Sequence, residues 1–210
     1  MVRKNTRSIL YFTPRERKDL LISWVTLSLA FAVMISPTLM NIKSLFYAFP
    51  IALFAVGTGF VFHELAHREA AKAFGFYSEF RAWYPGLVIA LILAIVTMGE
   101  FTFAAPGATY FFGTNVSRKQ NGIISAAGPA INIIIGMLLI AIAFTITAPL
   151  IKSILVWAGL INFWFAFFNL IPIYPLDGSK IIIWDTKTWL FMITISAILV
   201  FGGGYIYPLP

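Results

Sequence analysis

Five long, predominantly apolar stretches decide how this chain folds, and only the end of the second carries charge. About 20 consecutive apolar residues cross the hydrocarbon core of a bilayer as a helix. The stretches predict transmembrane helices over 20–37, 45–67, 123–147, 153–171 and 188–207. The second is apolar only as far as residue 62, and its last turn carries ionisable side chains. The pattern indicates an all-α polytopic membrane protein.

The composition supports a membrane protein and limits its chemistry. Of the 210 residues, 60% are hydrophobic and 11% are charged, whereas a soluble domain carries about 25% charged residues. The chain has no cysteine, which excludes disulfides and thiolate metal ligands. Its net charge of +7 comes from basic residues in short loops, as the positive-inside rule describes. No aromatic-basic patch indicates a nucleic-acid partner.

Two segments between the second and third of these helices are harder to interpret. The apolar part of 85–99 is short for a span, which favours a re-entrant or half-buried element. A sixth transmembrane helix over 86–105 is the alternative. The next segment, 101–113, combines aromatic and β-branched residues with a Pro-Gly pair, which is typical of a small β-hairpin or loop. The expected fold therefore has five to six transmembrane helices, a re-entrant segment and a small β-hairpin.

The positions of the basic residues favour the topology in which 85–99 turns back. In that topology only Lys43 and Lys152 lie on one side, and all other Lys and Arg residues lie on the side that the positive-inside rule makes cytoplasmic. The chain is then a single membrane domain, 1–210. It has a basic cytoplasmic arm over 1–19, a core over 45–180 and a C-terminal transmembrane helix over 188–207.

The two histidines of the chain, His63 and His67, lie in one string, HELAH, at the end of the second apolar stretch. Residues four apart share a helix face, so both imidazoles can bind one Zn²⁺. Glu64 can then act as general base on the water that such a metal activates. Ionisable residues in or beside a membrane helix are costly and usually functional. A solvated helix end that continues into the charged segment 68–72 is the alternative.

A catalytic zinc site needs a third protein ligand, and here that ligand must be a carboxylate. Glu16 and Asp19 lie in the basic arm and are expected at the surface. Asp177 lies in the string NLIPIYPLDG, whose two prolines must end the fourth helix. Irregular backbone at membrane depth is tolerated where it lines a cavity or is buried in protein. Asp177 is therefore the best candidate, and a proline turn with a solvated aspartate is the alternative. His67 and Asp177 can share a metal only if 85–99 turns back, or if the helices rearrange more deeply.

Three strings occur in a fixed order along the chain: HELAH, then AGPAIN at 127–132, then NLIPIYPLDG. This set resembles the site-2 protease family of intramembrane zinc metalloproteases, and most closely its compact prokaryotic members. The resemblance implies peptide-bond hydrolysis in or near the transmembrane segments of membrane-protein substrates, within a prokaryotic cell membrane. It also implies one catalytic zinc, held by His63, His67 and Asp177, with Glu64 as the catalytic base.

The resemblance gives roles to two asparagines as well. Asn132 matches a position that faces the active site and supports the substrate or the oxyanion, and Asn169 is expected to brace the unwound turn there. Interhelical hydrogen bonding is the alternative for both. The family often continues Asp-Gly-Gly, whereas this chain has DGSK at 177–180, which keeps the first glycine. The implied partners are a transmembrane substrate and the lipid bilayer, and the sequence indicates no oligomeric state.

Two other functions are compatible with the metal motif. A zinc transporter would use the same ligands, but transporters usually show repeated halves, and this chain shows no repeat. A catalytically silent protein would only bind membrane helices, which the intact Glu64 argues against. For a protease, the segment 101–112 is expected to hold the substrate as an added strand. In that case Thr102→Pro or Ala104→Pro should impair cleavage and spare zinc.

Overall fold

A computed structural model describes residues 11–36, 42–100, 107–113 and 115–206. This part of the chain is helical apart from one two-stranded sheet. The elements are, in order, α1 (Pro14–Ile35), α2 (Ile42–Val56), the π-helix η1 (Gly57–Val61), α3 (Phe62–Ala73), β1 (Tyr77–Ala82), α4 (Tyr84–Val96), β2 (Gly107–Phe112), α5 (Arg118–Thr145), α6 (Pro149–Leu170), α7 (Asp177–Trp184) and α8 (Thr186–Ile206).

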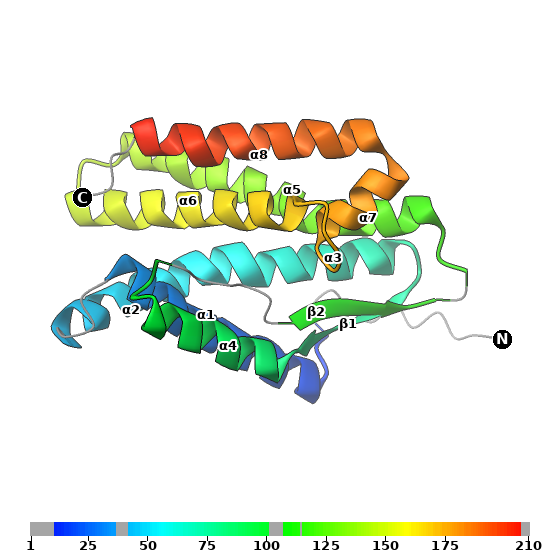
Figure 1. The fold of residues 1–210 in the computed structure, drawn as a ribbon, viewed down its shortest axis with the longest axis horizontal. Helices are drawn as coiled ribbons and strands as arrows, with labels where there is room; N and C mark the ends of the chain where they lie inside the picture. The colour runs from blue at the N-terminus through cyan, green and yellow to red at the C-terminus, as the bar shows by residue number, and fades with distance from the viewer. Residues whose placement is uncertain (1–10, 37–41, 101–106, 114, 207–210) are drawn as a thin grey trace.

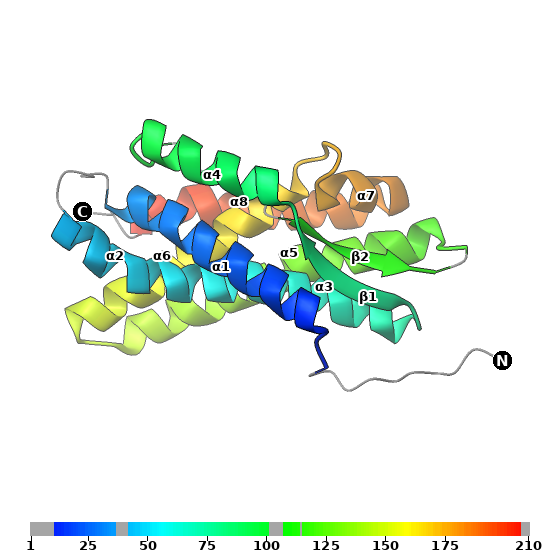
Figure 2. The same cartoon turned by 90° about the horizontal axis from the view of Figure 1, so that it is seen from below.

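The helices form a layered bundle around α2, η1 and α3, which continue one another as a single long helix. Figure 1 shows α5, α6 and α8 on one side of this helix, and α1, α4 and the sheet on the other. Figure 2 shows α1 and α4 side by side on the outer face, and the two helices contact each other. The sheet, α7, and the end of α3 lie at the same end of the bundle (Figure 1).

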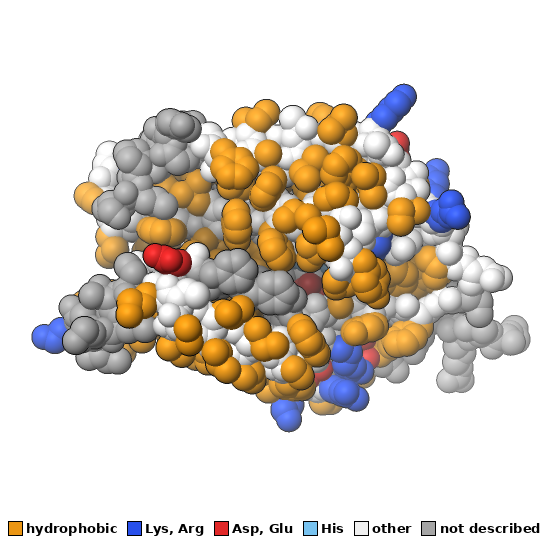
Figure 3. Space-filling model, in the orientation of Figure 1, with side chains coloured by type: hydrophobic (Ala, Val, Ile, Leu, Met, Phe, Trp, Pro, Cys, Tyr) orange, Lys and Arg blue, Asp and Glu red, His pale blue; other side chains and the backbone are white. Residues whose placement is uncertain are grey.

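Four helices of the described chain are long and apolar enough to cross a membrane. They are Pro14–Ile35, Lys43–Ala73, Arg118–Thr145 and Pro149–Leu170. Two further apolar helices are shorter, Tyr84–Val96 and Thr186–Gly202. In Figure 3, apolar side chains cover most of the visible face, and most Lys and Arg side chains on it gather at the end that carries the sheet. The protein is therefore a polytopic membrane protein, as its uncharged stretches predict.

Local sequence signals explain where the spanning helices begin and end. Thr13 caps α1 by accepting a hydrogen bond from the backbone N–H of Glu16. Ser117 begins α5 in a capping box with Gln120, which satisfies backbone donors that would otherwise be orphaned. Helix α6 ends at Leu170, two residues before a proline that cannot continue it. The chain then runs without helix to Asp177, as predicted.

The sheet shows where the segment between β1 and β2 begins and ends. Strands β1 and β2 pair antiparallel, with Tyr77 opposite Phe112 and Ala82 opposite Gly107. Both ends of the excursion between them therefore lie at the same end of the bundle. Helix α4 has 13 residues, or about 20 Å at 1.5 Å per residue, which is shorter than the roughly 30 Å hydrocarbon core. The prediction that 85–99 turns back is confirmed.

The small sheet differs in one respect from the hairpin expected within 101–113. The strand itself is present as β2, but its partner is β1, which the sequence did not indicate. Residues 101–106, including Thr102 and Ala104, lie outside the described part of the chain. Strand β1 reads YSEFRA, with two charged residues and little apolar alternation. Its partner lies about 30 residues further along the chain, so no short-range turn signal marks the pair.

Aromatic packing joins the layers behind the sheet. Phe31 of α1 stacks on Phe165 of α6 with ring centroids 5.5 Å apart. Phe60 of η1 meets Phe80 of β1 edge-on, also at 5.5 Å. All four side chains are less than 5% exposed. The first pair joins α1 to α6 across the bundle, and the second holds the π-helix η1 against the sheet.

Candidate active site

His63, His67 and Asp177 meet at the end of the bundle that carries the sheet. The two imidazole Nε2 atoms are 3.0 Å apart. Asp177 Oδ2 lies 3.3 Å from His63 Nε2 and 3.0 Å from His67 Nε2. All three side chains are buried. The structure thus brings together the three residues that the sequence indicates as a ligand set.

The spacing of these atoms fits zinc. Tetrahedral zinc with bonds of about 2.0–2.1 Å to nitrogen and oxygen separates its ligand atoms by about 3.3 Å. The three observed separations, 3.0 to 3.3 Å, are close to that value. Three protein ligands leave one coordination position open, which is the arrangement of a catalytic rather than a structural site.

Two glycines allow the surrounding backbone to approach the ligands. A Cβ on Gly128 of α5 would lie 2.5 Å from His67 Nε2 and 2.6 Å from His63 Nε2. A Cβ on Gly178 would lie 2.0 Å from the Leu170 carbonyl oxygen, so only glycine lets α7 begin against the end of α6. The glycine in AGPAIN therefore makes room for the metal site, and the glycine in DGSK places Asp177.

The second ring nitrogen of each histidine is held by a group in α5. His67 Nδ1 lies 2.7 Å from the Ile124 carbonyl oxygen, and His63 Nδ1 lies 2.5 Å from Asn132 Oδ1. A carbonyl oxygen can only accept, so Nδ1 of His67 carries the proton and Nε2 keeps its lone pair for a metal. Such contacts fix both the tautomer and the ring orientation of a ligand.

The two asparagines implied by the resemblance lie in different surroundings. Asn169 is partly exposed and lines the cavity beside the metal cluster, and its Nδ2 donates to the Phe165 carbonyl oxygen within α6 at 2.9 Å. Asn132 is fully buried and is not among the residues that line this cavity. Their roles in supporting a substrate or an oxyanion stay predictions.

Glu64 lies on the cavity side of α3, where strand β2 passes it. The Thr109 hydroxyl donates to Glu64 Oε2 at 2.8 Å, and Thr109 Oγ1 also lies 3.2 Å from the Glu64 carbonyl oxygen. Thr109 is a contact of the predicted base that the sequence did not single out. Only the long-range pairing of β2 beside α3 brings it there.

The cavity has a volume of about 120 Å³, which is ample for water. It is lined on one side by the metal cluster and Glu64, and on the other by β2 and by the turn before α7. Lys180 lies at its edge, and its Nζ donates to the other Asp177 oxygen, Oδ1, at 3.2 Å. Lys180 thus binds the second carboxylate oxygen of the third ligand, while Ser179 stands at the position of the family's second glycine.

The start of α1 is bound to the sheet by two carboxylates. Glu16 accepts from the backbone N–H of Phe80 and Asp19 from that of Ala82, both at 3.3 Å. Glu16 also pairs with Arg68 of α3 at 3.2 Å, and both are only 2% exposed. The expectation that Glu16 and Asp19 are surface charges is wrong, because the sheet and α3 cover them.

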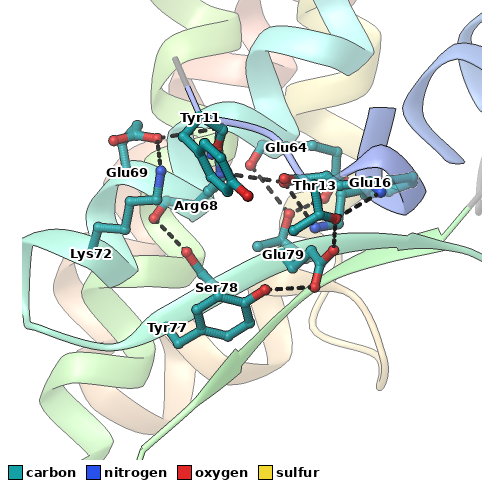
Figure 4. Close-up of polar contacts among 12 residues, drawn as sticks. Tyr11, Thr13, Glu16, Glu64, Arg68, Glu69, Lys72, Tyr77, Ser78 and Glu79 are labelled. Carbon is teal, nitrogen blue, oxygen red and sulfur yellow. Dashed lines mark hydrogen bonds and ion pairs between the residues drawn. The ribbon is translucent and has the colours of Figure 1, made fainter. Parts of the chain in front are cut away.

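Glu79 of β1 is the second acidic centre at this end (Figure 4). It accepts hydrogen bonds from Thr13, from Tyr77 at 2.9 Å and from Arg81 at 2.6 Å. Burial acts to raise the pKa of Glu79, but these three donors outweigh it and hold the pKa below its ordinary value. The carboxylate is therefore kept charged at neutral pH, where it joins α1 to β1.

Comparison with known proteins places this arrangement in a family. A family model described as peptidase family M50 matches residues 145–185. The chain is 40% identical over 188 residues to a Methanocaldococcus jannaschii protein provisionally named as a zinc metalloprotease, MJ0611, over 87% of this chain and 91% of the relative. It is 29% identical over 163 residues to the zinc metalloprotease MJ0392 of the same organism, with 75% of this chain and 40% of the relative covered.

A relative from Mycolicibacterium smegmatis, provisionally named as the zinc metalloprotease Rip2, is 29% identical over 132 residues. That match covers 55% of this chain and 49% of the relative, so the chain spans about half the length of this relative. No solved structure matches the chain at a significant level.

A His-His-Asp cluster beside a glutamate, at the end of a membrane-length helix, defines the class as a membrane-embedded metalloprotease. The chain belongs to the site-2 protease family, peptidase family M50, and is a zinc metalloprotease.

Proposed function

We propose that this protein hydrolyses peptide bonds in or near the transmembrane segments of membrane-protein substrates. The observation that carries the proposal is the position of the metal cluster, whose two histidines lie within the second half of a helix that is long and apolar enough to span a bilayer. His63, His67 and Asp177 hold the zinc in this proposal, and Glu64 is the catalytic base. Zinc, when bound there, supplies the Lewis acidity that makes water a nucleophile near neutral pH.

Glu64 has the surroundings that a general base requires. It lies directly after a ligand on the same helix and lines the water-sized cavity. One of its oxygens, Oε2, accepts a hydrogen bond from Thr109, so the carboxylate is oriented. The other oxygen can take a proton from water and pass it to the leaving amine. General acid-base catalysis of this kind contributes about 10²- to 10⁴-fold in rate.

Strand β2 is the proposed holder of the extended substrate. The N–H groups of Phe80 and Ala82 in β1 are bound by Glu16 and Asp19, so α1 closes the outer edge of β1. Hydrogen bonding alternates along an antiparallel pair. Thr109 and Phe111 therefore direct their backbone groups away from β1, and both residues line the cavity. Main-chain pairing at a strand edge binds extended peptides without strict sequence requirements.

The proposed location is a prokaryotic cell membrane, with the N-terminus and the active-site end on the cytoplasmic side. The active-site end carries Arg15, Arg17, Arg68, Arg81, Lys180 and other basic residues, whereas Lys43 and Lys152 belong to the opposite end. This distribution supports the assignment through the positive-inside rule. The proposed partners are the substrate helix and the bilayer.

The test is cleavage of a model transmembrane substrate by purified protein in detergent, with zinc quantified in the wild type and in Glu64→Gln. The proposal expects that Glu64→Gln removes cleavage and leaves about one zinc per chain. Glu69→Gln is the matched control, because Glu69 follows the motif on the same helix, is partly exposed and pairs with Lys72. It should cleave like the wild type.

A zinc transporter is the alternative function, and the same variant separates the two. Transport through the His-His-Asp cluster needs the ligands but not a base. Zinc movement into proteoliposomes that survives Glu64→Gln, without cleavage of any substrate by the wild type, would replace the protease proposal.

A further inference from the structure

A chain of buried side-chain hydrogen bonds runs behind His63, through three helices. Asn132 of α5 and Asn162 of α6 are both fully buried. Asn132 Nδ2 donates to Asn162 Oδ1 at 3.0 Å, and Asn162 Nδ2 donates to Thr58 Oγ1 of η1, also at 3.0 Å. Polar groups in the apolar interior of a membrane protein are costly unless every one has a partner. This series of hydrogen bonds leads to the metal ligand His63, so the buried polar groups in it support the metal site.

The partners in this chain determine which way each amide faces. Asn132 Nδ2 also lies 2.7 Å from the Gly59 carbonyl oxygen, which can only accept. The amide nitrogen of Asn132 must therefore face Gly59, and its oxygen must face His63. Since Asn132 Oδ1 accepts, the proton of His63 lies on Nδ1, and Nε2 is left with its lone pair directed at the metal position.

Asn162 holds Asn132 in that orientation. Its oxygen takes the second amide hydrogen of Asn132, and its own nitrogen is bound by Thr58 and by the Ala158 carbonyl oxygen at 2.8 Å. Both hydrogens of the Asn132 amide are thus used within the protein. The π-helix η1 contributes both Gly59 and Thr58 to these contacts, and π-helical turns are frequent at functional sites.

We infer that Asn162, acting through Asn132, is a positioning residue for the zinc ligand His63, and that Asn132 supports the metal site instead of donating to the substrate carbonyl. The inference rests on the proposed zinc site. Asn132 is fully buried and lies outside the cavity lining, and neither of its amide hydrogens is free for an oxyanion. Asn169, which does line the cavity, is then the asparagine available to a substrate.

Substitutions that interrupt this series of hydrogen bonds should weaken zinc binding. Removing a group that orients a metal ligand typically lowers metal affinity by about 10- to 100-fold. Asn132→Leu should reach this range, since it removes the direct partner of His63. Asn162→Leu should lower zinc affinity by about tenfold, because Gly59 still binds the Asn132 amide. Thr58→Val has nearly the same shape and should have a smaller effect in the same direction.

The experiment measures zinc affinity by competition with a chelator, on full-length protein in detergent. Ser28→Ala is the matched control, because Ser28 is also fully buried in a spanning helix and donates only within α1, at 2.7 Å to the Trp24 carbonyl oxygen. It should bind zinc like the wild type. Thermal unfolding of each variant identifies any that fail to fold, and in that case the near-isosteric Thr58→Val decides.

A second readout follows the His63 ring itself. The chain has two histidines, so selective ¹⁵N labelling of histidine gives two Nδ1–H signals in the zinc-loaded protein. Asn162→Leu should shift or broaden the His63 signal and leave that of His67, which Ile124 holds. Unchanged zinc affinity together with an unchanged His63 signal in Asn132→Leu and Asn162→Leu would overturn the inference. So would a loss of kcat in Asn132→Leu at unchanged zinc affinity, the result expected of an oxyanion donor.

Neither readout depends on proteolysis. If the wild type binds zinc and cleaves no substrate, the proposed function fails while the zinc series still tests the inference. If the series shows no effect in a protein that does cleave, the inference fails and the proposed function stands.

Discussion

The two sides of α3 are supported by different kinds of structure. On the α5 side, His63 and His67 are held by the buried Asn132 and by the Ile124 carbonyl oxygen. On the sheet side, Glu64 is held by the Thr109 hydroxyl of β2, which borders the cavity. One helix therefore presents its metal ligands to a fixed helical layer and its base to a strand that is open to substrate.

This difference matches what each group must do. A metal ligand needs one tautomer and one direction, which buried amide and carbonyl partners provide. A base must receive and release a proton, which a single hydroxyl partner beside water permits. Substitutions on the α5 side should therefore lower zinc affinity. Substitutions on the sheet side should lower kcat or stability and leave zinc affinity constant.

The largest expected effect is on stability, at the sheet side. Arg68→Met removes the positive charge that pairs with the buried Glu16 carboxylate. Breaking a buried ion pair in this way costs about 3–5 kcal/mol, measured as the free energy of unfolding in detergent. Lys72→Met is the control, since the Lys72–Glu69 pair is partly exposed and should contribute under about 1 kcal/mol. An equal loss of unfolding free energy in the two variants would show that the Arg68–Glu16 pair is not desolvated.

The next effect is on zinc, at the α5 side. Gly128→Ala places a Cβ about 2.5 Å from His67 Nε2 and must displace a ligand. Zinc affinity should fall by about 100-fold, and cleavage should fall with it. Gly202→Ala is the matched change, because a Cβ there meets nothing within 4 Å. Full zinc affinity in Gly128→Ala would contradict the close approach of α5 to the site.

A smaller effect is expected on the base. Thr109→Val removes the hydrogen bond to Glu64 Oε2. Hydrogen bonds to charged groups contribute about 1.5–3 kcal/mol, so kcat should fall by at least about tenfold. Zinc affinity should stay constant, and Thr109→Ser should restore most of the rate. A parallel loss of zinc affinity in Thr109→Val would remove the distinction between the two sides of α3.

The smallest effect concerns the pH dependence of stability. The pKa of Glu79 is lowered from its ordinary value of 4.5 in the folded protein. A lowered carboxylate pKa contributes stability above the ordinary pKa, and this contribution is lost as the pH falls through the folded pKa. Unfolding measured from pH 7 downward should therefore show a loss below about pH 4.5 that Glu79→Gln reduces. If stability depends on pH in the same way in the wild type and in Glu79→Gln, Glu79 makes no such contribution.

The fold was predictable from the sequence where one stretch of residues decides the outcome alone. The uncharged stretches gave the helices, because a segment in lipid must satisfy its own backbone. The two histidines of HELAH share a face by helical periodicity. The proline-broken turn and the charge distribution together indicated Asp177 and the return of 85–99, and the strand pairing confirms that return.

The missed features all depend on contacts between distant segments. Strand β1 has no alternation of its own, and Glu16 looks like a surface residue until β1 and Arg68 are placed against it. Asn162 is flanked by apolar residues in α6, and no local pattern marks it. Thr109 reaches Glu64 only because β2 pairs with β1. Such partners follow from the packed structure and not from sequence spacing.

The separation of the metal ligands along the chain has a consequence for synthesis. His63 and His67 leave the ribosome early, whereas Asp177 follows only after α5 and α6. A nascent chain therefore enters the membrane with two of its three ligands and no competent site. We expect chains truncated before residue 177 to bind zinc more weakly than the full chain, because they lack the third ligand. Completion of the metal site is therefore a late step of folding, because it requires α7 to pack against α5.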